Sequence, residues 1–375
     1  MRSLMFVSSL AMLAATPSAG LAEDCEAPCI DYSGSFDTTF WWIGPGGNAT
    51  PNSILIDSTA ELEATARLLP RLSIAISALA DPLRDSKPGK NRIFEDAGAQ
   101  LDNLRLQYDG DDFSLWAGKI HPVFGRAHDV APGLYGAEAG AGYELNERIG
   151  AGGSYSFAAG GFSSIIAASA FTLDRTALSG SLFSHRGRTT LADGGAGNTA
   201  GISSVALSLA GCKGADFDSC YDDGELGYQL SARYQRGGEG SAGDEIGLAA
   251  GINRQIPLTG ESTLKFFAEA AWFWNYDGAS NDAMFGAASA ALVQGNVTAS
   301  LTLAAQDVLA AHGGHTQAYV ADAALLYDLG GSIGLAGDSW SIGLGYTFIQ
   351  ENGFHTHYIG LKAETTFEGS LLFRD

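Results

Sequence analysis

Regular alternation of apolar and polar residues constrains this chain more than any other feature. In the stretch "YIGLKAETTFEGSLLF" (358–373), the odd positions from Ile359 to Phe373 are mostly apolar, whereas the even positions include Lys362 and Glu364. Successive side chains of a β-strand point to opposite faces, so this stretch is predicted to be a strand with one apolar and one charged face. A soluble antiparallel strand can show the same alternation, so the interpretation depends on how often the pattern recurs.

The pattern recurs along the chain from residue 31 onward. Clear examples are "LKFFAEAAWFW" from Leu264, "VTASLTL" from Val297 and "WSIGLGYTF" from Trp340, each with its apolar residues on one face. No stretch demands a long helix. We predict strands at 31–43, 53–68, 71–80, 98–108, 112–120, 147–158, 162–172, 200–210, 225–236, 244–256, 262–275, 281–293, 295–305, 316–328, 339–349 and 355–373.

The connections between these segments favour a barrel. Most even-numbered connections are short, such as "LPR", "DGD" and "AGG", whereas the odd-numbered connections 81–97, 121–146 and 173–199 are long. The even-numbered connections 211–224 and 329–338 depart from this rule. We therefore predict an all-β fold, a transmembrane antiparallel β-barrel of about 16 strands with short periplasmic turns and long outer loops.

A soluble β-propeller or solenoid is the alternative fold. The sequence contains no repeat of fixed period, and its Gly-rich acidic pieces do not form tandem calcium-binding nonapeptides. Composition also favours the membrane barrel, because only 17% of the residues are charged, against about 25% in an average domain. Aromatic residues such as Trp272, Trp274 and Tyr346 lie towards strand ends, where a membrane interface requires them.

The first residues predict export. One positive charge at Arg2 precedes an apolar run over 4–15, and Gly20 and Ala22 form the small-x-small pattern that signal peptidase recognises. We predict a signal peptide over 1–22 and a single β-barrel domain over 23–375. A membrane anchor is the alternative, but the apolar run is shorter than the about 20 residues of a spanning helix.

The net charge of −21 constrains the partners. Nucleic-acid binding requires basic surface, so we expect no nucleic-acid partner. A strongly acidic protein attracts cations rather than anions. We predict no cofactor.

The four cysteines form two close pairs in sequence, Cys25 with Cys29 and Cys212 with Cys220. In an exported chain they are disulfide candidates that close short loops, although four cysteines allow three connectivities. Zinc is the alternative for "CEAPC", but no histidine lies near it in the sequence.

A sixteen-strand barrel is too wide for side chains to fill, so we expect a water-filled channel. The apolar faces would contact lipid, because a charge at the middle of the bilayer costs about 2–4 kcal/mol, whereas a charge in the channel is hydrated. The charged residues predicted to face the channel include Glu61, Glu63, Arg67, Arg105, Arg233, Lys265, Glu269, Asp322, Lys362 and Glu364.

These features together resemble a Gram-negative outer-membrane porin. The third outer connection, 121–146, carries Pro122-x-Phe124-Gly125, which is similar to the P-E-F-G motif of general porins, with Val123 in place of the glutamate. The stretch also resembles porins of the alphaproteobacterial type. The resemblance implies that this connection folds into the barrel and narrows the pore.

The resemblance also implies the location and the partners. It implies residence in the cell outer membrane, contact with its lipid and lipopolysaccharide, and assembly as a homotrimer. Porin chains end on an aromatic residue that the barrel-assembly machinery recognises, and here Phe373 is followed by Arg374 and Asp375.

We predict a pore constriction in which charges of the third loop face a basic wall. Rings of charge tune ion selectivity in pores. An alternative is that these charges pair with one another and only satisfy the channel wall. The loop contributes Arg126, Asp129 and Glu138, and the wall contributes Arg67, Arg105 and Lys362.

The seven histidines fall in or beside predicted outer loops. Four of them, His312, His315, His355 and His357, belong to consecutive outer connections and are candidate ligands of a metal or groups of a pH-dependent gate. The plainer interpretation is polar loop composition, and we predict no metal.

Three functions are compatible with the sequence. The first is a porin for passive diffusion of small hydrophilic solutes and ions, with a preference for cations. The second is a substrate-selective channel for a sugar or an anion. The third is a barrel enzyme, which requires a constellation such as Ser and His at the rim, but Ser184 and His185 are neighbours in sequence and would point apart. We name no catalytic residue and predict no enzyme.

Overall fold

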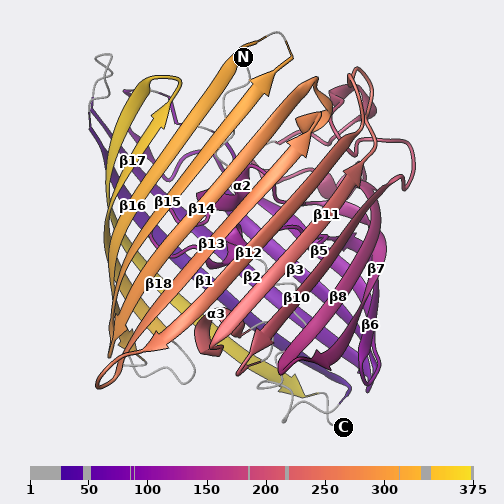
Figure 1. Cartoon of the computed structure of the whole chain (residues 1–375), viewed down its shortest axis with the longest axis horizontal. Coiled ribbons are helices and arrows are strands. Elements are labelled where there is room, and N and C mark those ends of the chain that lie inside the picture. Colours follow the sequence, from indigo (N-terminus) through magenta and orange to yellow (C-terminus); the bar gives the residue numbers. More distant parts are fainter. Residues whose placement is uncertain are drawn as a thin grey trace.

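The computed structural model describes residues 27–44, 52–84, 86–87, 89–184, 186–215, 219–311, 313–330 and 339–372. The predicted signal peptide, Cys25, His185, His312 and Phe373 lie outside these residues. Eighteen strands are hydrogen-bonded into one sheet, and two of them, β4 and β9, are only two residues long. Figure 1 shows the strands tilted around a barrel.

The other sixteen strands form the wall. They are β1 (Cys29–Ile43), β2 (Ser53–Leu69), β3 (Leu72–Pro82), β5 (Ala97–Asp109), β6 (Phe113–Ile120), β7 (Arg148–Ala159), β8 (Phe162–Leu173), β10 (Ser204–Lys213), β11 (Leu226–Gln235), β12 (Glu245–Pro257), β13 (Ser262–Trp274), β14 (Asn281–Gln294), β15 (Val297–Ala310), β16 (His315–Gly330), β17 (Ser339–Glu351) and β18 (Phe354–Leu372).

The remaining elements are short. They are the strands β4 (Arg92–Ile93) and β9 (Leu182–Phe183), the helices α1 (Ala127–Val130), α2 (Glu138–Ala141) and α3 (Cys220–Asp223), and the 3-10 turns η1 (Ala177–Ser179), η2 (Leu191–Asp193) and η3 (Tyr276–Gly278). No helix of the described residues is long and apolar enough to cross a membrane.

The sheet closes on itself. Each of the sixteen strands pairs antiparallel with its neighbours in chain order, and β1 pairs with β18 from Cys29 opposite Leu372 to Ile43 opposite Tyr358. Closure removes the exposed sheet edge, so the strands can satisfy all their backbone groups inside a bilayer. The predicted fold class, a sixteen-strand antiparallel barrel, is confirmed.

The two faces of the wall differ as the alternation predicts. Along β12, Ile246, Leu248 and Ile252 are exposed on the outer face, whereas Glu245 and Asn253 are buried on the inner face. Exposed apolar residues of this kind surround the barrel on all sides, among them Leu62, Leu115, Ile166, Leu207, Leu230, Leu301, Leu325, Leu344 and Leu361. An apolar belt of this extent indicates contact with membrane lipid.

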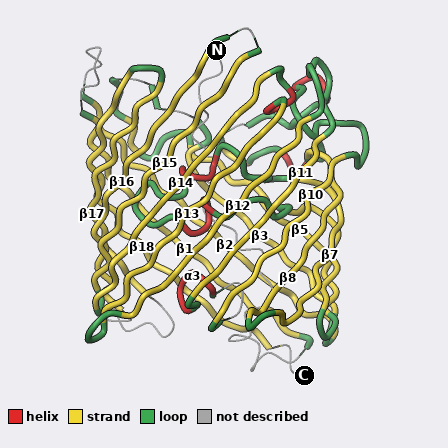
Figure 2. The backbone as a smooth tube through the Cα atoms, in the orientation of Figure 1, coloured by secondary structure: helices red, strands yellow, loops and turns green. Residues whose placement is uncertain are grey.

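The two ends of the barrel carry different connections. At one end, the connections at 70–71, 110–112, 160–161, 258–261 and 295–296 are tight turns, and the connection between β10 and β11 is longer and contains α3. At the other end, the first connections are long, but 275–280, 311–314 and 352–353 are also short. Figure 2 shows loops and helices in the interior as well as at the ends.

Lys119 is a charged residue on the otherwise apolar outer face of β6. The structure buries it under the loop that contains η1. Its ammonium group lies 2.9 Å from a carboxylate oxygen of Glu147 and 3.1 Å from one of Asp174, and it donates a hydrogen bond to the Leu178 carbonyl. Lys119 thereby fastens this outer loop to the rim of the barrel.

Candidate functional site

The connection between β6 and β7, residues 121–147, folds into the barrel and is called the inward loop here. It contains α1 and α2, and its buried residues pack against inner-face residues of β13 and β14. Figure 1 shows α2 within the outline of the barrel, away from both ends. Four groups of contacts, on β13, on β11, at the tip of the loop and at its base, hold this loop in place.

Glu269 of β13 holds the start of α1. Its carboxylate accepts hydrogen bonds from the backbone N–H groups of Arg126 (2.8 Å) and Ala127 (3.0 Å) and from the Tyr143 hydroxyl (2.5 Å). The side chain of Glu269 is buried, so the three donors replace the water that a carboxylate otherwise requires. One wall residue therefore fixes both limbs of the inward loop.

Arg233 of β11 makes the second attachment. Its guanidinium bonds the Glu245 carboxylate at 2.8 Å and the Tyr143 carbonyl at 2.5 Å, and it lies 4.6 Å above the centre of the Phe124 ring and 4.5 Å above that of Phe273. Arg233 and Glu245 are both at least 95% buried. Charge pairing and cation–π contact therefore stabilise the loop together.

The tip of the loop docks on β15 to β18. The Thr302 hydroxyl donates a 2.6 Å hydrogen bond to the Pro132 carbonyl, and the Asp322 carboxylate accepts from the backbone N–H groups of Leu134 and Tyr135. Thr347 in turn donates to Asp322 at 2.6 Å. Polar groups of the wall thus satisfy the backbone of the tip.

Leu134 inserts into a socket that glycines leave open. A Cβ atom at Gly345 would lie 2.7 Å from Leu134 Cδ1, and one at Gly343 would lie 3.0 Å from Leu134 Cδ2. Both glycines belong to the inner face of β17, where larger side chains would exclude the leucine. Glycine inside a strand often marks such a close approach.

Three aromatic residues meet where the tip reaches β1 and β18. The ring centre of Tyr135 lies 5.7 Å from that of Trp41 and 5.8 Å from that of Tyr358, and Trp41 and Tyr358 are 6.1 Å apart. Trp41 is buried, whereas Tyr135 and Tyr358 are partly exposed. The group forms a small aromatic surface in the lumen.

The base of the loop contains two contacts between a histidine and a carboxylate. His121 Nε2 lies 3.4 Å from Asp102 Oδ1, and His128 Nε2 lies 3.3 Å from Glu144 Oε2. Although burial lowers the pKa of His121, the Asp102 carboxylate outweighs it and raises that pKa to about 9. Burial raises the pKa of Asp129 and that of Glu144 to about 7.

The three predicted constriction residues of the loop lie on its helices. Arg126 directly precedes α1, Asp129 lies within α1, and Glu138 begins α2. The Arg126 side chain is buried, whereas Asp129 and Glu138 are partly exposed.

The three predicted wall residues lie apart from one another. Arg67 bonds Asp31 at 2.9 Å, close to the end of β2 that bears the tight turns. Arg105 is buried on β5 and donates to Gln107 at 3.0 Å, and the Lys362 ammonium lies 3.2 Å from Glu364. The six residues therefore come from the inward loop and from three different strands, β2, β5 and β18.

The Pro122-x-Phe124-Gly125 motif opens the inward loop. Phe124 is buried, with its ring centre 5.6 Å from that of Phe273, and Gly125 has a φ of +77° that favours glycine. Gln229 donates a hydrogen bond to the Gly125 carbonyl at 3.1 Å. The motif thus supplies an apolar anchor and a turn.

Three of the four candidate metal ligands, His315, His355 and His357, lie within the described residues. His355 and His357 lie in β18 on its outer face, where the His357 ring accepts or donates a 2.7 Å hydrogen bond with the Tyr346 hydroxyl. His315 Nδ1 lies 3.4 Å from Asp307. Among the residues that the structure describes, no group of three metal-binding side chains could hold an ion.

Two of the predicted disulfide cysteines are joined in the structure. A disulfide connects Cys212 at the end of β10 to Cys220 at the start of α3. Cys29 is also disulfide-bonded, whereas Cys25 lies outside the described residues.

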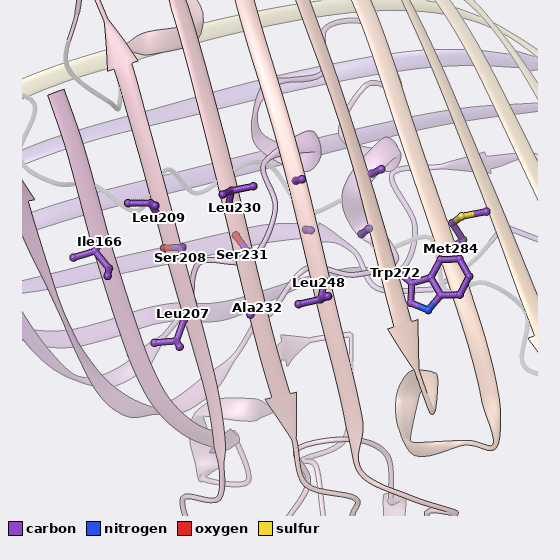
Figure 3. A pocket seen from close by; sticks show the side chains of 14 residues that line it. Ile166, Leu207, Ser208, Leu209, Leu230, Ser231, Ala232, Leu248, Trp272 and Met284 are labelled. Carbon is purple, nitrogen blue, oxygen red and sulfur yellow. The ribbon is translucent and has the colours of Figure 1, made fainter. Parts of the chain in front are cut away.

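A groove of about 610 Å³ lies on the outer face of the wall from β8 to β14. Figure 3 shows Leu207, Leu230, Leu248, Trp272 and Met284 around it. All five side chains are exposed on the lipid-facing surface, so this groove belongs to the apolar belt and not to the channel.

Several residues that hold the inward loop were not predicted from the sequence. Tyr143, Thr302 and Leu134 carried no recognisable motif. The glycines at 343 and 345 did carry a signal, because they occupy the polar face of a strand at successive positions.

No known protein family matches the sequence, and no curated protein does so either. Solved structures do resemble the fold. Outer-membrane expressed OmpT of Vibrio cholerae aligns with a TM-score of 0.51 at 10% identity, over 92% of this chain and 99% of that one. OccK9 (OpdG) of Pseudomonas aeruginosa aligns with a TM-score of 0.51 at 10% identity, over 91% of this chain and 98% of that one. An anion-selective porin from Comamonas acidovorans aligns with a TM-score of 0.49 at 13% identity, over 91% of this chain and 99% of that one.

The fold and the site together define the class. The structure is a closed barrel with an exposed apolar belt, and it shares its fold with outer-membrane proteins. It is an outer-membrane β-barrel with a porin-like fold. The apolar belt and this fold place the chain in the cell outer membrane.

Proposed function

We propose that this protein is an outer-membrane porin, a water-filled channel through which small hydrophilic solutes and ions diffuse passively. The observation that carries the proposal is the docking of the inward loop on inner-face residues of the wall. Its anchors Arg233, Glu269, Thr302 and Asp322 lie on β11 to β16. The loop narrows the lumen from that side, and we place the passage beside the inner faces of β2, β3 and β5, where Glu61, Glu63 and Arg105 lie.

We propose that the channel prefers cations. The carboxylates of Glu61 and Glu63 on β2 and of Asp102 on β5 interact electrostatically with one another, and Asp102 also contacts His121 at the base of the inward loop. Asp129 and Glu144 of the inward loop add negative charge. Facing cations such as Arg105 are fewer, and the protein as a whole carries a net charge of −21. A narrow passage with excess negative charge concentrates cations.

The constriction is formed by Asp129 and Glu138 on the loop side and by Arg105 and Lys362 on the wall side. Arg126 supports the loop through its backbone contact with Glu269. Arg67, paired with Asp31 near the turn-bearing end, acts on ions as they leave the constriction.

A substrate-selective channel is the second candidate. The aromatic surface of Trp41, Tyr135 and Tyr358 favours it, because sugar rings stack on aromatic side chains. A channel of this kind binds one solute before releasing it, so its transport saturates.

Liposome swelling tests the proposal against this alternative. Purified protein in liposomes is exposed to neutral sugars of increasing size. A porin gives swelling rates that fall smoothly with solute size and rise linearly with concentration. A rate that saturates for one sugar, and falls in a Trp41→Ala variant, favours the selective channel.

We propose no catalytic activity. Passive diffusion requires no nucleophile or general base. Hydrolysis of an ester or peptide substrate by the purified protein, abolished in a Ser184→Ala variant, would contradict this part of the proposal.

The partners follow from the proposed function. We infer that the outer face contacts lipid and lipopolysaccharide, and that the barrel-assembly machinery inserts the chain. Exposed Phe94, Leu182 and Phe183 near the loop-bearing rim support self-association as a homotrimer. Light scattering in detergent tests it, with a monomer as the contradicting result.

Two finer assignments are also proposals. The alphaproteobacterial porin type rests on the motif at 122–125 alone. A Cys25–Cys29 disulfide rests on their spacing and on the oxidised state of Cys29.

A further inference from the structure

The connection between β10 and β11 differs from the other turns at its end of the barrel. Its described part comprises Lys213–Ala215 and Ser219–Glu225 and is called the α3 turn here. The neighbouring connections at 160–161 and 258–261 are tight turns, whereas this one is longer and is closed by the Cys212–Cys220 disulfide. The feature was visible in the sequence as a departure from short turns, without a function attached to it.

The α3 turn is held against the inner face of β12. Asn253 Nδ2 donates a hydrogen bond to the Cys220 carbonyl at 3.1 Å, and Gln255 Nε2 donates to the Tyr221 carbonyl at 2.8 Å. Both residues lie an even number of positions from Glu245 along β12, so their side chains share its lumen-facing side of the strand. The turn therefore folds towards the lumen and not away from it.

Lys265 of β13 makes the second attachment. Its ammonium group lies 2.8 Å from Asp222 Oδ1 and 5.4 Å from the centre of the Tyr221 ring. Lys265 and Glu269 occupy the same face of β13 four positions apart, which corresponds to about 13 Å along the strand. One strand thus carries the anchor of the inward loop and, further towards the turn-bearing end, the anchor of the α3 turn.

Two glycines make this packing sterically feasible. A Cβ atom at Gly224 would lie 2.4 Å from Cys212 Sγ, and one at Gly227 would lie 2.6 Å from Cys220 Sγ. Any larger residue at either position would displace the disulfide. The local sequence is therefore adapted to hold the turn close to the wall.

We infer that the α3 turn is a second selectivity element, in series with the inward loop, at the turn-bearing end of the channel. This inference rests on the proposed function. Asp222 and Asp223 are exposed on the turn, and Asp222 is attached to the lumen side through Lys265. The Asp223 carboxylate presents negative charge to ions at the mouth of the passage, whereas the charge of Asp222 is paired with Lys265. The disulfide fixes the position of this charge.

The α3 turn affects the channel in two separate ways, through its charge and through its position. Charge on the α3 turn sets part of the ion preference, and the disulfide sets how far the turn extends into the mouth. Removing the charge changes the reversal potential. Removing the disulfide lets the turn move and raises the single-channel conductance.

Planar-bilayer recording of the full chain under a KCl gradient tests both effects. The variants are Asp223→Asn alone, which leaves the Asp222–Lys265 ion pair intact, Asp222→Asn with Asp223→Asn, and Cys212→Ser with Cys220→Ser. The control is Asp111→Asn with Asp112→Asn, an exposed acidic pair on the tight turn between β5 and β6 at the same end. Heat-modifiable migration in gel electrophoresis verifies that each variant is folded.

We expect Asp223→Asn and the Asp222/Asp223 variant both to shift the reversal potential towards zero, while the Asp111/Asp112 control matches the wild type. We expect the cysteine variant to increase the conductance step. Wild-type steps with an unchanged Asp222/Asp223 variant overturn this inference alone. Because this variant retains the disulfide, its result does not depend on whether the cysteine variant folds. Absence of steps from folded wild-type protein overturns the proposed function and this inference with it.

Discussion

At the scale of single residues, the inward loop depends on a few buried polar groups of the wall. Glu269 satisfies three donors from two limbs of the loop, and Arg233 joins a carboxylate, a carbonyl and two aromatic rings. The sequence predicted that both residues face the channel, because alternation fixes the face of a strand residue. It could not predict their partners, because the inward-loop groups that Glu269 binds lie more than 120 positions away along the chain and Tyr143 lies 90 positions from Arg233.

We expect Glu269→Gln to loosen the inward loop. The amide retains one acceptor oxygen, but its NH₂ group faces donors, so the loss of charged hydrogen bonds costs about 2 kcal/mol. Single-channel recording should show larger and noisier current steps than the wild type. Glu261→Gln, at an exposed glutamate in the turn between β12 and β13, is the matched control. Steps identical to the wild type would refute the role of Glu269.

We expect Gly345→Val to displace the tip of the loop. The new side chain would occupy the space of Leu134, because a Cβ atom added at this position would lie 2.7 Å from Leu134 Cδ1. The conductance should become unstable while the barrel remains heat-modifiable. Gly286→Val is the control, because a Cβ there meets no atom within 4 Å. Equal recordings from the two variants would contradict the socket.

At the scale of elements, the strands were more predictable than the loops. All sixteen long strands were predicted, because the period of two identifies a strand without knowledge of its partners. The errors were largest at β10, which begins at Ser204 and not at 200, and at β15, which continues to Ala310 and not to 305. The additional residues of β15 include Asp307 on the outer face, where its carboxylate lies 3.4 Å from His315 of β16.

The inward placement of two connections was only partly predictable. The resemblance at Pro122-x-Phe124-Gly125 implied it for the inward loop, but nothing in the pattern implied it for the α3 turn. Contacts such as Asn253 with Cys220 join residues of different elements, and a periodic pattern contains no information about them.

The inward loop should make ion selectivity depend on pH. The pKa values of Asp129 and Glu144 are raised by burial to about 7, so both groups gain negative charge as the pH rises from about 6 to about 8. The preference for cations over anions should therefore increase over this interval. Reversal potentials at a series of pH values measure it, and Asp129→Asn with Glu144→Gln should flatten the curve. A curve that falls with pH would contradict the assignment.

At the scale of the whole molecule, the main structural feature is the closure of the sheet into a barrel. The pairing of β1 with β18 removes the last open edge, and it gives the inward loop a rigid frame against which to dock. Because the sheet closes on itself, no second sheet covers its apolar outer face, and membrane lipid covers it instead.

A cross-link across the seam tests this closure. Phe40 lies opposite Leu361 in the register of β1 and β18. We expect Phe40→Cys with Leu361→Cys to be joined by a short bismaleimide in the folded protein. The control, Phe40→Cys with Ile342→Cys, places the second thiol on β17, which does not pair with β1. Efficient linking in the control and none in the test pair would rule out the register.

The central claim is that this barrel is an open, acid-lined passage. Planar-bilayer conductance of the purified wild-type protein under a KCl gradient measures both properties at once. We predict discrete current steps with a reversal potential that indicates cation selectivity. Folded, heat-modifiable protein that gives no steps would contradict an open channel. Steps with anion selectivity would keep the channel and contradict the assignment of its charge.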